Sequence, residues 1–213
     1  MTSSVEALVL ERLIGGEGGQ GWRGGHIENA LALHLFAILV LADSSLTCPA
    51  CWSSPSDRPK LQACPLELAL PSFYQNIGEK LEEKLSRITN EEAFLSNEVT
   101  ECWEASRGIW LRGLDRERWS LEETLDLARC VGGTVVSGML RLLAQDYHGW
   151  SGGMPDLFLW KPNGLHGEEE TARWVEVKGP GDSLRTSQRA WLDRLATWGA
   201  TAEVIYVSES SPN

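Results

Sequence analysis

The sequence lacks an excess of basic residues. Its 213 residues include 19 Lys and Arg against 30 Asp and Glu, a formal net charge of −11 at pH 7. A surface that neutralises many phosphates needs Lys and Arg, so this composition excludes a broad, uniformly basic nucleic-acid-binding surface. It leaves three alternatives: a local basic track, a carboxylate cluster whose charge metal ions offset, or a binding surface that lies elsewhere in a larger assembly.

Long apolar segments and a leader are also lacking. The longest apolar stretch, Leu31–Ala42, is interrupted by His34 and is shorter than the roughly 20 residues that span a bilayer, so we expect a buried helix. Met1–Arg12 contains no basic region followed by an apolar run, so we expect no signal peptide. The five cysteines, an odd number without a secretory signal, favour reduced thiols in an intracellular protein.

The composition is otherwise that of a soluble globular protein, with 42% hydrophobic and 23% charged residues. The length suggests one large domain or two closely packed ones. Ten tryptophans are unusual. Composition alone leaves open whether they fill a core, stack on bases, or do both.

Helical periodicity dominates the first two thirds of the chain. Apolar residues at helical spacing and capping signals predict helices near Val5–Leu13, over His26–Ala42, Pro71–Thr89, Glu91–Ser106, from Ser120 to Gly132, and over Thr134–Tyr147. Ser120 with Glu123 forms a capping-box pattern. The stretch Asp43–Cys64, rich in Ser, Pro and Cys, is expected to be a loop.

The pattern changes after His148. Short apolar and aromatic runs predict strands at Asp156–Trp160, Arg173–Lys178 and Glu203–Val207, with a helix that begins at Thr186 or Ser187 and ends at Gly199. Lys161–Thr171 and Gly179–Asp182 are expected to be turns or loops. The C-terminal third therefore reads β-β-α-β after a helical region.

A glycine-rich segment, Gly15–Gly25, contains the pattern GxGxxG at Gly16–Gly21. A dinucleotide fingerprint needs a strand before it and a helix on its last glycine. Here a predicted helix precedes the pattern and Trp22-Arg23 follows it. A flexible loop is the better interpretation.

The strongest chemical signal is on the strand Arg173–Lys178. Because side chains alternate between faces, Glu176 and Lys178 share one face, and Asp156 begins the neighbouring strand. A strand-edge ion pair is the plain alternative for an isolated ExK. If the strands form a hairpin, two carboxylates and a backbone carbonyl, that of Val177, make an oxygen-rich site suited to Mg²⁺ or Mn²⁺. Lys178 would then orient or help deprotonate a water and stabilise phosphate charge during phosphodiester hydrolysis.

These residues resemble a known family. Gly152–Leu157, then Val175–Asp182, then Gln188 are similar to the VRR-NUC domain of the Fanconi-anaemia-associated nucleases, in the PD-(D/E)xK superfamily. The likeness extends upstream to Cys130–Gly133 and Pro65–Leu68, so it covers nearly the whole chain.

The resemblance implies an α/β fold, a restriction-endonuclease-like β-β-α-β core with an N-terminal helical region packed on it. Residues 1–147 would be the helical part, with the loop 43–64, residues 148–208 the catalytic core, and 209–213 a tail. It implies metal ligation by Asp156 and Glu176, with Lys178 as the catalytic lysine. It adds Glu28, which would project from a helix start after His26, and Gln188 as site support, for which ordinary helix capping is the alternative.

The function implied by the resemblance is a metal-dependent DNA nuclease selective for 5′ flaps or branched DNA. Its setting would be DNA repair, including interstrand cross-link repair, in the nucleus. A non-catalytic DNA-binding or protein-interaction module that retains the fold is the alternative. Two positions depart from the family pattern: Asn29 stands where Gly is usual, and Ser187 where Lys is frequent, with Arg185 and Arg189 nearby. Regions found ahead of the domain in long family members, including those that bind repair partners, are not in this sequence.

Cysteines offer a rival metal site. Cys48, Cys51 and Cys64 make part of a zinc-binding pattern, with His26 and His34 as upstream candidates. A second CxxC is lacking, so free thiols in a loop are the better interpretation. His148 and His166 lack partner spacing and are expected at the surface.

Overall fold

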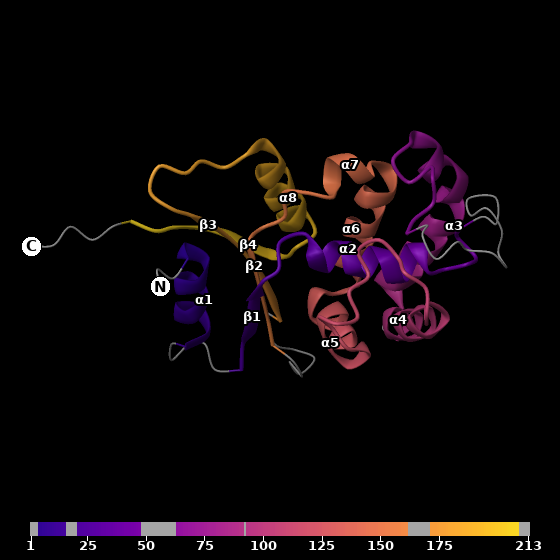
Figure 1. Ribbon diagram of the computed structural model, residues 1–213, viewed down its shortest axis with the longest axis horizontal. Helices are drawn as coiled ribbons and strands as arrows, with labels where there is room; N and C mark the ends of the chain where they lie inside the picture. The colour runs from indigo at the N-terminus through magenta and orange to yellow at the C-terminus, as the bar shows by residue number, and fades with distance from the viewer. Residues whose placement is uncertain (1–3, 16–20, 48–62, 92, 162–170, 209–213) are drawn as a thin grey trace, which may run out of the picture. The chain divides into compact units, whose positions relative to one another are not determined.

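The computed structural model describes residues 4–15, 21–47, 63–91, 93–161 and 171–208. Contacts divide the chain into two compact units, residues 1–29 with 153–213, and residues 30–152. We call them the sheet unit and the helical unit. Figure 1 colours the chain by residue number, and the two ends of the sequence carry the elements of the sheet unit.

The sheet unit is built on four strands in the order β1-β2-β3-β4. The strands are β1 (Arg23–His26), β2 (Leu157–Trp160), β3 (Ala172–Lys178) and β4 (Thr201–Tyr206). β1 and β2 pair antiparallel, as do β2 and β3, whereas β3 and β4 are parallel. The parallel connection passes through helix α8 (Thr186–Thr197), so the expected β-β-α-β order is confirmed.

Each face of this sheet packs on a helix. Helix α1 (Val5–Gly15) places Val9 in a cluster with Leu157, Leu159, Val175 and Val177. The alternate positions of β3, Glu176 and Lys178, therefore point to the other face. There Gln188 of α8 donates to Glu176, and α8 buries Trp191 and Leu195. Val175 and Val177 thus build core while Glu176 and Lys178 face α8.

Strand β1 was not expected, and it corrects two predictions. The sequence predicted a helix from His26, but Arg23–His26 pair residue by residue with Trp160–Leu157. Gly24 and Gly25 have low strand propensity, so tertiary pairing overrides the local preference. Because β1 and α1 belong to the sheet unit, the first 29 residues group with the C-terminal part, unlike the expected division at residue 147. The glycine pattern at 16–21 lies almost wholly outside the described residues.

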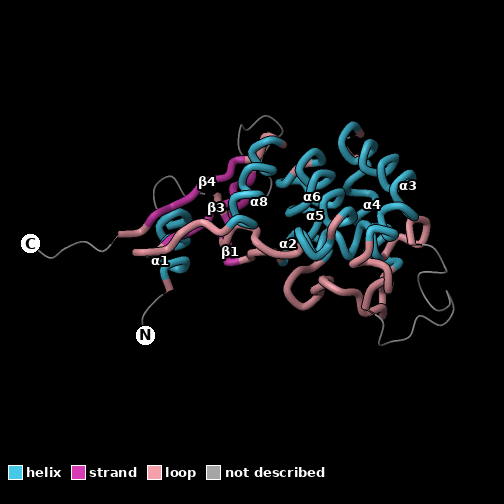
Figure 2. Tube along the Cα trace, turned by 90° about the horizontal axis from the view of Figure 1, so that it is seen from above, coloured by secondary structure: helices cyan, strands magenta, loops and turns pink. Residues whose placement is uncertain are grey.

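The helical unit surrounds one buried helix. Helix α2 (Ala30–Phe36) continues as the π-helical segment η2 (Ala37–Leu41), and Leu31–Leu41 is almost entirely buried, His34 included. The remaining helices are α3 (Pro71–Asn90), α4 (Phe94–Ala105), α5 (Leu121–Val131), α6 (Gly133–Gln145) and α7 (Tyr147–Trp150). Figure 2 shows these helices gathered as one group, with the sheet strands in the other unit. The capping box of Ser120 and Glu123 is confirmed.

The helices were also compared with the length and hydropathy that a bilayer span requires. Among the described residues no single helix is long and apolar enough to cross a membrane. One bent pair, α5 with α6, reaches that length and composition only when both helices are counted together.

The alternative zinc site cannot use His34, one of its candidate ligands, in this structure. His34 is fully buried, its Nδ1 accepts from the backbone N–H of Asp115, and its Nε2 bonds Thr124 Oγ1 at 3.0 Å. Both ring nitrogens are therefore engaged within the core. Cys48 and Cys51 lie outside the described residues, as does His166, while Cys64 is half-buried and is not in a disulfide. His148 is exposed in α7, as expected.

Candidate active site

Asp156 is held at the start of β2 by hydrogen bonds from two other segments. Its backbone carbonyl accepts from the N–H groups of Ile27 and Glu28, at 3.0 and 3.2 Å. Its carboxylate Oδ2 accepts from the N–H of Val177 at 2.9 Å. The first pair of bonds continues the β1–β2 ladder, and the second reaches β3. Asp156 therefore joins the three antiparallel strands at one end of the sheet.

Glu176 and Lys178 form a buried pair on β3. Glu176 is fully buried, Lys178 is 7% exposed, and Lys178 Nζ lies 2.6 Å from Glu176 Oε1. Burial raises the pKa of Glu176 and the charge of Asp156 raises it further, while the hydrogen bond from Lys178 opposes both effects. The strand-edge ion pair on a solvated face, the plain alternative for this motif, is therefore wrong.

Gln188 combines the two roles expected for it. Its Oε1 accepts from the N–H of Arg185, the residue before α8, and its Nε2 donates to Glu176 Oε1. The capping bond fixes which end of the amide points at the carboxylate. Helix α8 begins at Thr186 because Gln188, its third residue, closes this box with Arg185.

One carboxylate oxygen of Glu176, Oε2, has an unusual environment. Among the described residues no group donates a hydrogen bond to Glu176 Oε2, although the atom is buried. A buried carboxylate oxygen without a donor is costly unless a cation or water satisfies it. This orphaned oxygen beside Asp156 is the arrangement that a divalent cation would complete.

Glu28 lies at the site, but its secondary structure differs from the expected one. It lies in the turn between β1 and α2, not in the first turn of a helix, and its φ is +45°. This left-handed conformation is uncommon for a non-glycine residue and recurs at functional sites. Asn29, where the family pattern has glycine, accepts from the N–H of Met154 at 3.0 Å. Asn29 thereby ties this turn to the loop before Asp156.

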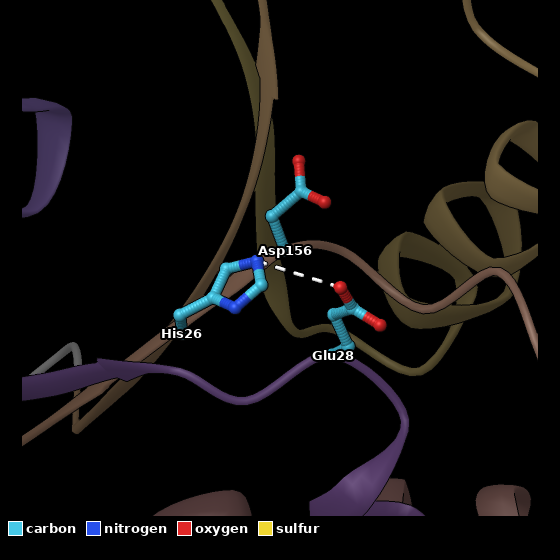
Figure 3. A group of neighbouring side chains, drawn as sticks. All are labelled: His26, Glu28 and Asp156. Atoms are coloured by element: carbon cyan, nitrogen blue, oxygen red, sulfur yellow. Dashed lines mark ion pairs between the residues drawn. The ribbon is translucent and has the colours of Figure 1, made fainter. Parts of the chain in front are cut away.

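Glu28, Asp156 and His26 form one group of side chains. Their ligand atoms all lie within 4.8 Å of one another, and His26 Nε2 is 3.4 Å from Glu28 Oε1 (Figure 3). Glu176 instead faces Lys178 and Gln188, next to Asp156. The structure thus brings together the predicted residues Glu28, Asp156, Glu176, Lys178 and Gln188. Sequence reasoning did not assign His26 to the site, although its place two residues before Glu28 was the available signal.

The donor set fits a hard divalent cation. Carboxylate oxygens are what Mg²⁺ and Mn²⁺ prefer, and the group of Figure 3 contains those of Glu28 and Asp156. Glu176, whose pKa is raised by the charge of Asp156, adds a buried Oε2 without a donor among the described residues. Val177 contributes its N–H to Asp156, and the proposed ligand role of its carbonyl stays a prediction.

Comparison with known families agrees with this geometry. The family model of the VRR-NUC domain matches residues 90–209. The chain belongs to the VRR-NUC family. The matched range includes the whole of β2, β3, α8 and β4 with Asp156, Glu176, Lys178 and Gln188, whereas Glu28 lies outside it.

Two relatives show which VRR-NUC proteins this chain is similar to. It is 38% identical over 209 residues to a Fanconi-associated nuclease 1 homolog of Arabidopsis thaliana, covering 97% of this chain and 22% of that protein. It is 39% identical over 152 residues to Fanconi-associated nuclease 1 of Ailuropoda melanoleuca, covering 70% and 14%. The chain thus spans about a fifth of the plant relative's length. The expected resemblance is confirmed.

Solved structures confirm the fold of the VRR-NUC chain. A crystal structure of paFAN1 bound to DNA with a 2-nucleotide 5′ flap and a gap matches with a TM-score of 0.72 at 24% identity, over 98% of this chain and 36% of that one. At this identity the likeness establishes the shared α/β architecture.

Proposed function

We propose that this chain is a metal-dependent nuclease that hydrolyses phosphodiester bonds of DNA. The observation that carries the proposal is the buried Glu176–Lys178 pair beside Asp156, in which Glu176 Oε2 has no donor among the described residues. A carboxylate buried without a partner lowers stability, so its retention points to chemistry rather than to packing.

Glu28, Asp156, Glu176 and the carbonyl of Val177 would hold Mg²⁺ or Mn²⁺. A cation bound there supplies a Lewis acid for the phosphate and lowers the pKa of a water. Asp156 is fixed by the N–H of Val177, and Glu176 by Lys178 and Gln188, so the carboxylates need little rearrangement to bind. This ordering of ligands by hydrogen bonds is typical of metal sites.

Lys178 has the position for two tasks. Its ammonium lies at the end of β3 and is kept in place by Glu176. It would orient the attacking water by donating a hydrogen bond, and it would stabilise the negative charge that develops on the phosphate oxygens. Because both tasks require the ammonium at this point, shortening or neutralising the side chain should reduce turnover. It also removes the partner of the buried Glu176 carboxylate, so a loss of stability is expected as well.

The substrate class follows from the relatives. They are named Fanconi-associated nucleases, and paFAN1 was solved with 5′-flap DNA. We extend this to the present chain as selectivity for flapped or branched DNA, in DNA repair including interstrand cross-link repair, in the nucleus. The net charge of −11 favours the alternative, a non-catalytic module of the same fold.

The test compares Lys178→Met with Lys161→Met on labelled 5′-flap, duplex and single-stranded DNA. Each variant removes one lysine charge from the sheet unit, but Lys161 follows β2 at the end away from Asp156, near Trp22. We expect Lys178→Met to reduce cleavage by roughly 100-fold or more and Lys161→Met to retain it. Equal activity of wild type and Lys178→Met, or binding of DNA without cleavage by wild type in any metal, would favour the non-catalytic alternative.

A further inference from the structure

An imidazole stands in the donor group of Figure 3, and the proposed function assigns it no role. His26 ends β1, and its Nε2 lies 3.4 Å from Glu28 Oε1 within the group completed by Asp156. The side chains of His26 and Glu28 are 51% and 52% exposed, so solvent and ions reach both. The three side chains come from two different segments of the chain.

The backbone holds these segments at a fixed spacing. His26 pairs with Leu157 in the β1–β2 ladder, and the next two N–H groups, of Ile27 and Glu28, both donate to the carbonyl of Asp156. Directly after these bonds the chain turns at Glu28, whose φ is +45°. The three ligand atoms are therefore brought together by backbone hydrogen bonds rather than by a chance meeting of flexible side chains.

A surface ion pair does not account for this arrangement. An exposed His–Glu pair contributes little stability, too little to offset a strained backbone at Glu28. An independent observation points to a cation. Glu176 lies across the ladder from Asp156, because Leu157 pairs with Val175, and its Oε2 is buried with no donor among the described residues. The imidazole of His26 and the carboxylates of Glu28 and Asp156 make a mixed nitrogen and oxygen set, with Glu176 on the strand next to Asp156.

We propose that His26 is a nitrogen ligand of the metal held by Glu28 and Asp156, and that it makes the site favour Mn²⁺ over Mg²⁺. The inference rests on the metal site of the proposed function and names the selectivity of that site. Imidazole suits transition metals, whereas Mg²⁺ prefers oxygen and gives up its waters reluctantly. A small rotation of the half-exposed ring moves Nε2 from Glu28 to an ion that both residues share.

The test uses Mn²⁺ alone with the full chain, without DNA. Pulsed electron paramagnetic resonance detects the ¹⁴N coupling of an imidazole bound to Mn²⁺, and calorimetric titration measures the affinities for Mn²⁺ and Mg²⁺. His26→Gln replaces the nitrogen ligand with an amide, and His148→Gln makes the same change at an exposed position of the helical unit. Circular dichroism checks that both variants are folded.

We expect ¹⁴N coupling in the wild type and in His148→Gln, and its loss in His26→Gln. The affinity of His26→Gln for Mn²⁺ should fall about 10-fold, within the range found when groups around a metal are changed, while that for Mg²⁺ changes much less. Bound Mn²⁺ without ¹⁴N coupling in the wild type would overturn the inference. So would an equal loss of affinity for both ions, because His26 would then only orient Glu28.

These readouts separate the inference from the proposed function. Metal-dependent cleavage by a wild type without ¹⁴N coupling would retain the nuclease and reject His26 as a ligand. A ¹⁴N-coupled Mn²⁺ without cleavage of any DNA would retain the ligand and reject the nuclease.

Discussion

Gln188 shows how one side chain serves both a helix and a reactive group. Its carbonyl oxygen caps α8 through Arg185, and its amide nitrogen donates to Glu176. Gln188→Ala removes both bonds, whereas Gln188→Glu keeps the capping acceptor and places a second carboxylate against Glu176. The two variants therefore separate stability from activity.

We expect Gln188→Ala to lower the free energy of unfolding by about 1 kcal/mol through loss of the cap. Gln188→Glu should lose less stability from the helix but reduce metal-dependent cleavage by roughly 10- to 100-fold, as changes around metal ligands do. Chemical denaturation and initial cleavage rates measure the two effects. Wild-type activity in Gln188→Glu would show that Gln188 is only a cap.

The residues that meet at the candidate site were largely named from the sequence, because a PD and ExK spacing on neighbouring strands indicates an oxygen-rich metal site. The contact of Gln188 with Glu176 was expected only in outline. His26 was not assigned to the site from the sequence, because its closeness to Asp156 depends on the pairing of β1 with β2. The plain alternative for an isolated ExK, a solvated ion pair, is wrong because Glu176 is fully buried.

Between elements, the loop before Asp156 depends on a glycine. Gly153 has φ +91°, and a Cβ there would lie 2.7 Å from both Cβ and Oγ of Ser187 in α8. A Cβ on the neighbouring Gly152 would meet nothing within 4 Å, and the φ of Gly152 is ordinary. The small Ser187, where the family pattern frequently has Lys, packs on Gly153.

Gly153→Ala should therefore destabilise the chain by about 1–3 kcal/mol, from backbone strain together with the clash, and should lower cleavage by displacing Asp156. Gly152→Ala is the matched control and should change the free energy of unfolding by less than about 1 kcal/mol. Thermal and denaturant unfolding measure both variants. Equal effects at the two positions would contradict the close approach of this loop to α8.

His34, in the buried helix α2 of the helical unit, leads to a second prediction at this scale. Burial lowers the pKa of His34 from 6.5 to about 4, with Asp115 opposing the shift. Between these two pH values the unfolded chain binds a proton that folded His34 does not. Stability is therefore full above the unfolded value and falls as the pH drops from about 6.5 towards 4, by up to about 1.4 kcal/mol per pH unit.

Unfolding free energies of the wild type, His34→Asn and His148→Asn over this range test the linkage. His34→Asn should show a shallower slope whatever its absolute stability, and His148→Asn should keep the wild-type slope, because His148 is exposed. A slope in His34→Asn as steep as in the wild type would assign the pH dependence to other groups.

Secondary-structure prediction succeeded for helices with a long apolar periodicity. It failed for a strand that forms only because it pairs with another strand. Helix α3 was predicted within a residue, and its predicted apolar stripe from Phe73 to Ile88 is buried. Strand β1 was missed because two of its four residues are glycine and only β2 makes it a strand. Residues 1–29 group with the C-terminal part because of that pairing. No local sequence pattern predicts the pairing.

At the scale of the whole molecule, metal binding should stabilise the folded state. Ions bound only by the folded chain raise the melting temperature with their concentration, and at 100 times the dissociation constant they add about 2.7 kcal/mol to the free energy of unfolding. Because burial raises the pKa of Glu176, protons compete with the metal, so the stabilisation by Mn²⁺ should shrink as the pH is lowered. Asp156→Ala is the control and should lose most of it. A Mn²⁺ effect that is the same in Asp156→Ala would place the ion elsewhere.

The excess of acidic residues is also a property of the whole molecule. Part of the charge of −11 lies in the site itself, where Glu28 and Asp156 lie close together and a bound cation would offset their charge. The chain covers only 22% of its Arabidopsis relative, so its acidic charge is not the charge of a protein of that length.

The most direct measurement is cleavage of labelled 5′-flap DNA by the wild type and by Asp156→Ala, with Mn²⁺, Mg²⁺ or EDTA, at high enzyme and low salt. We predict cleavage by the wild type with either metal, none with EDTA, and none by Asp156→Ala under any condition, because the carboxylate of Asp156 is a proposed metal ligand. Cleavage that survives in EDTA or in Asp156→Ala, or a wild type that cuts with neither metal, would contradict the account.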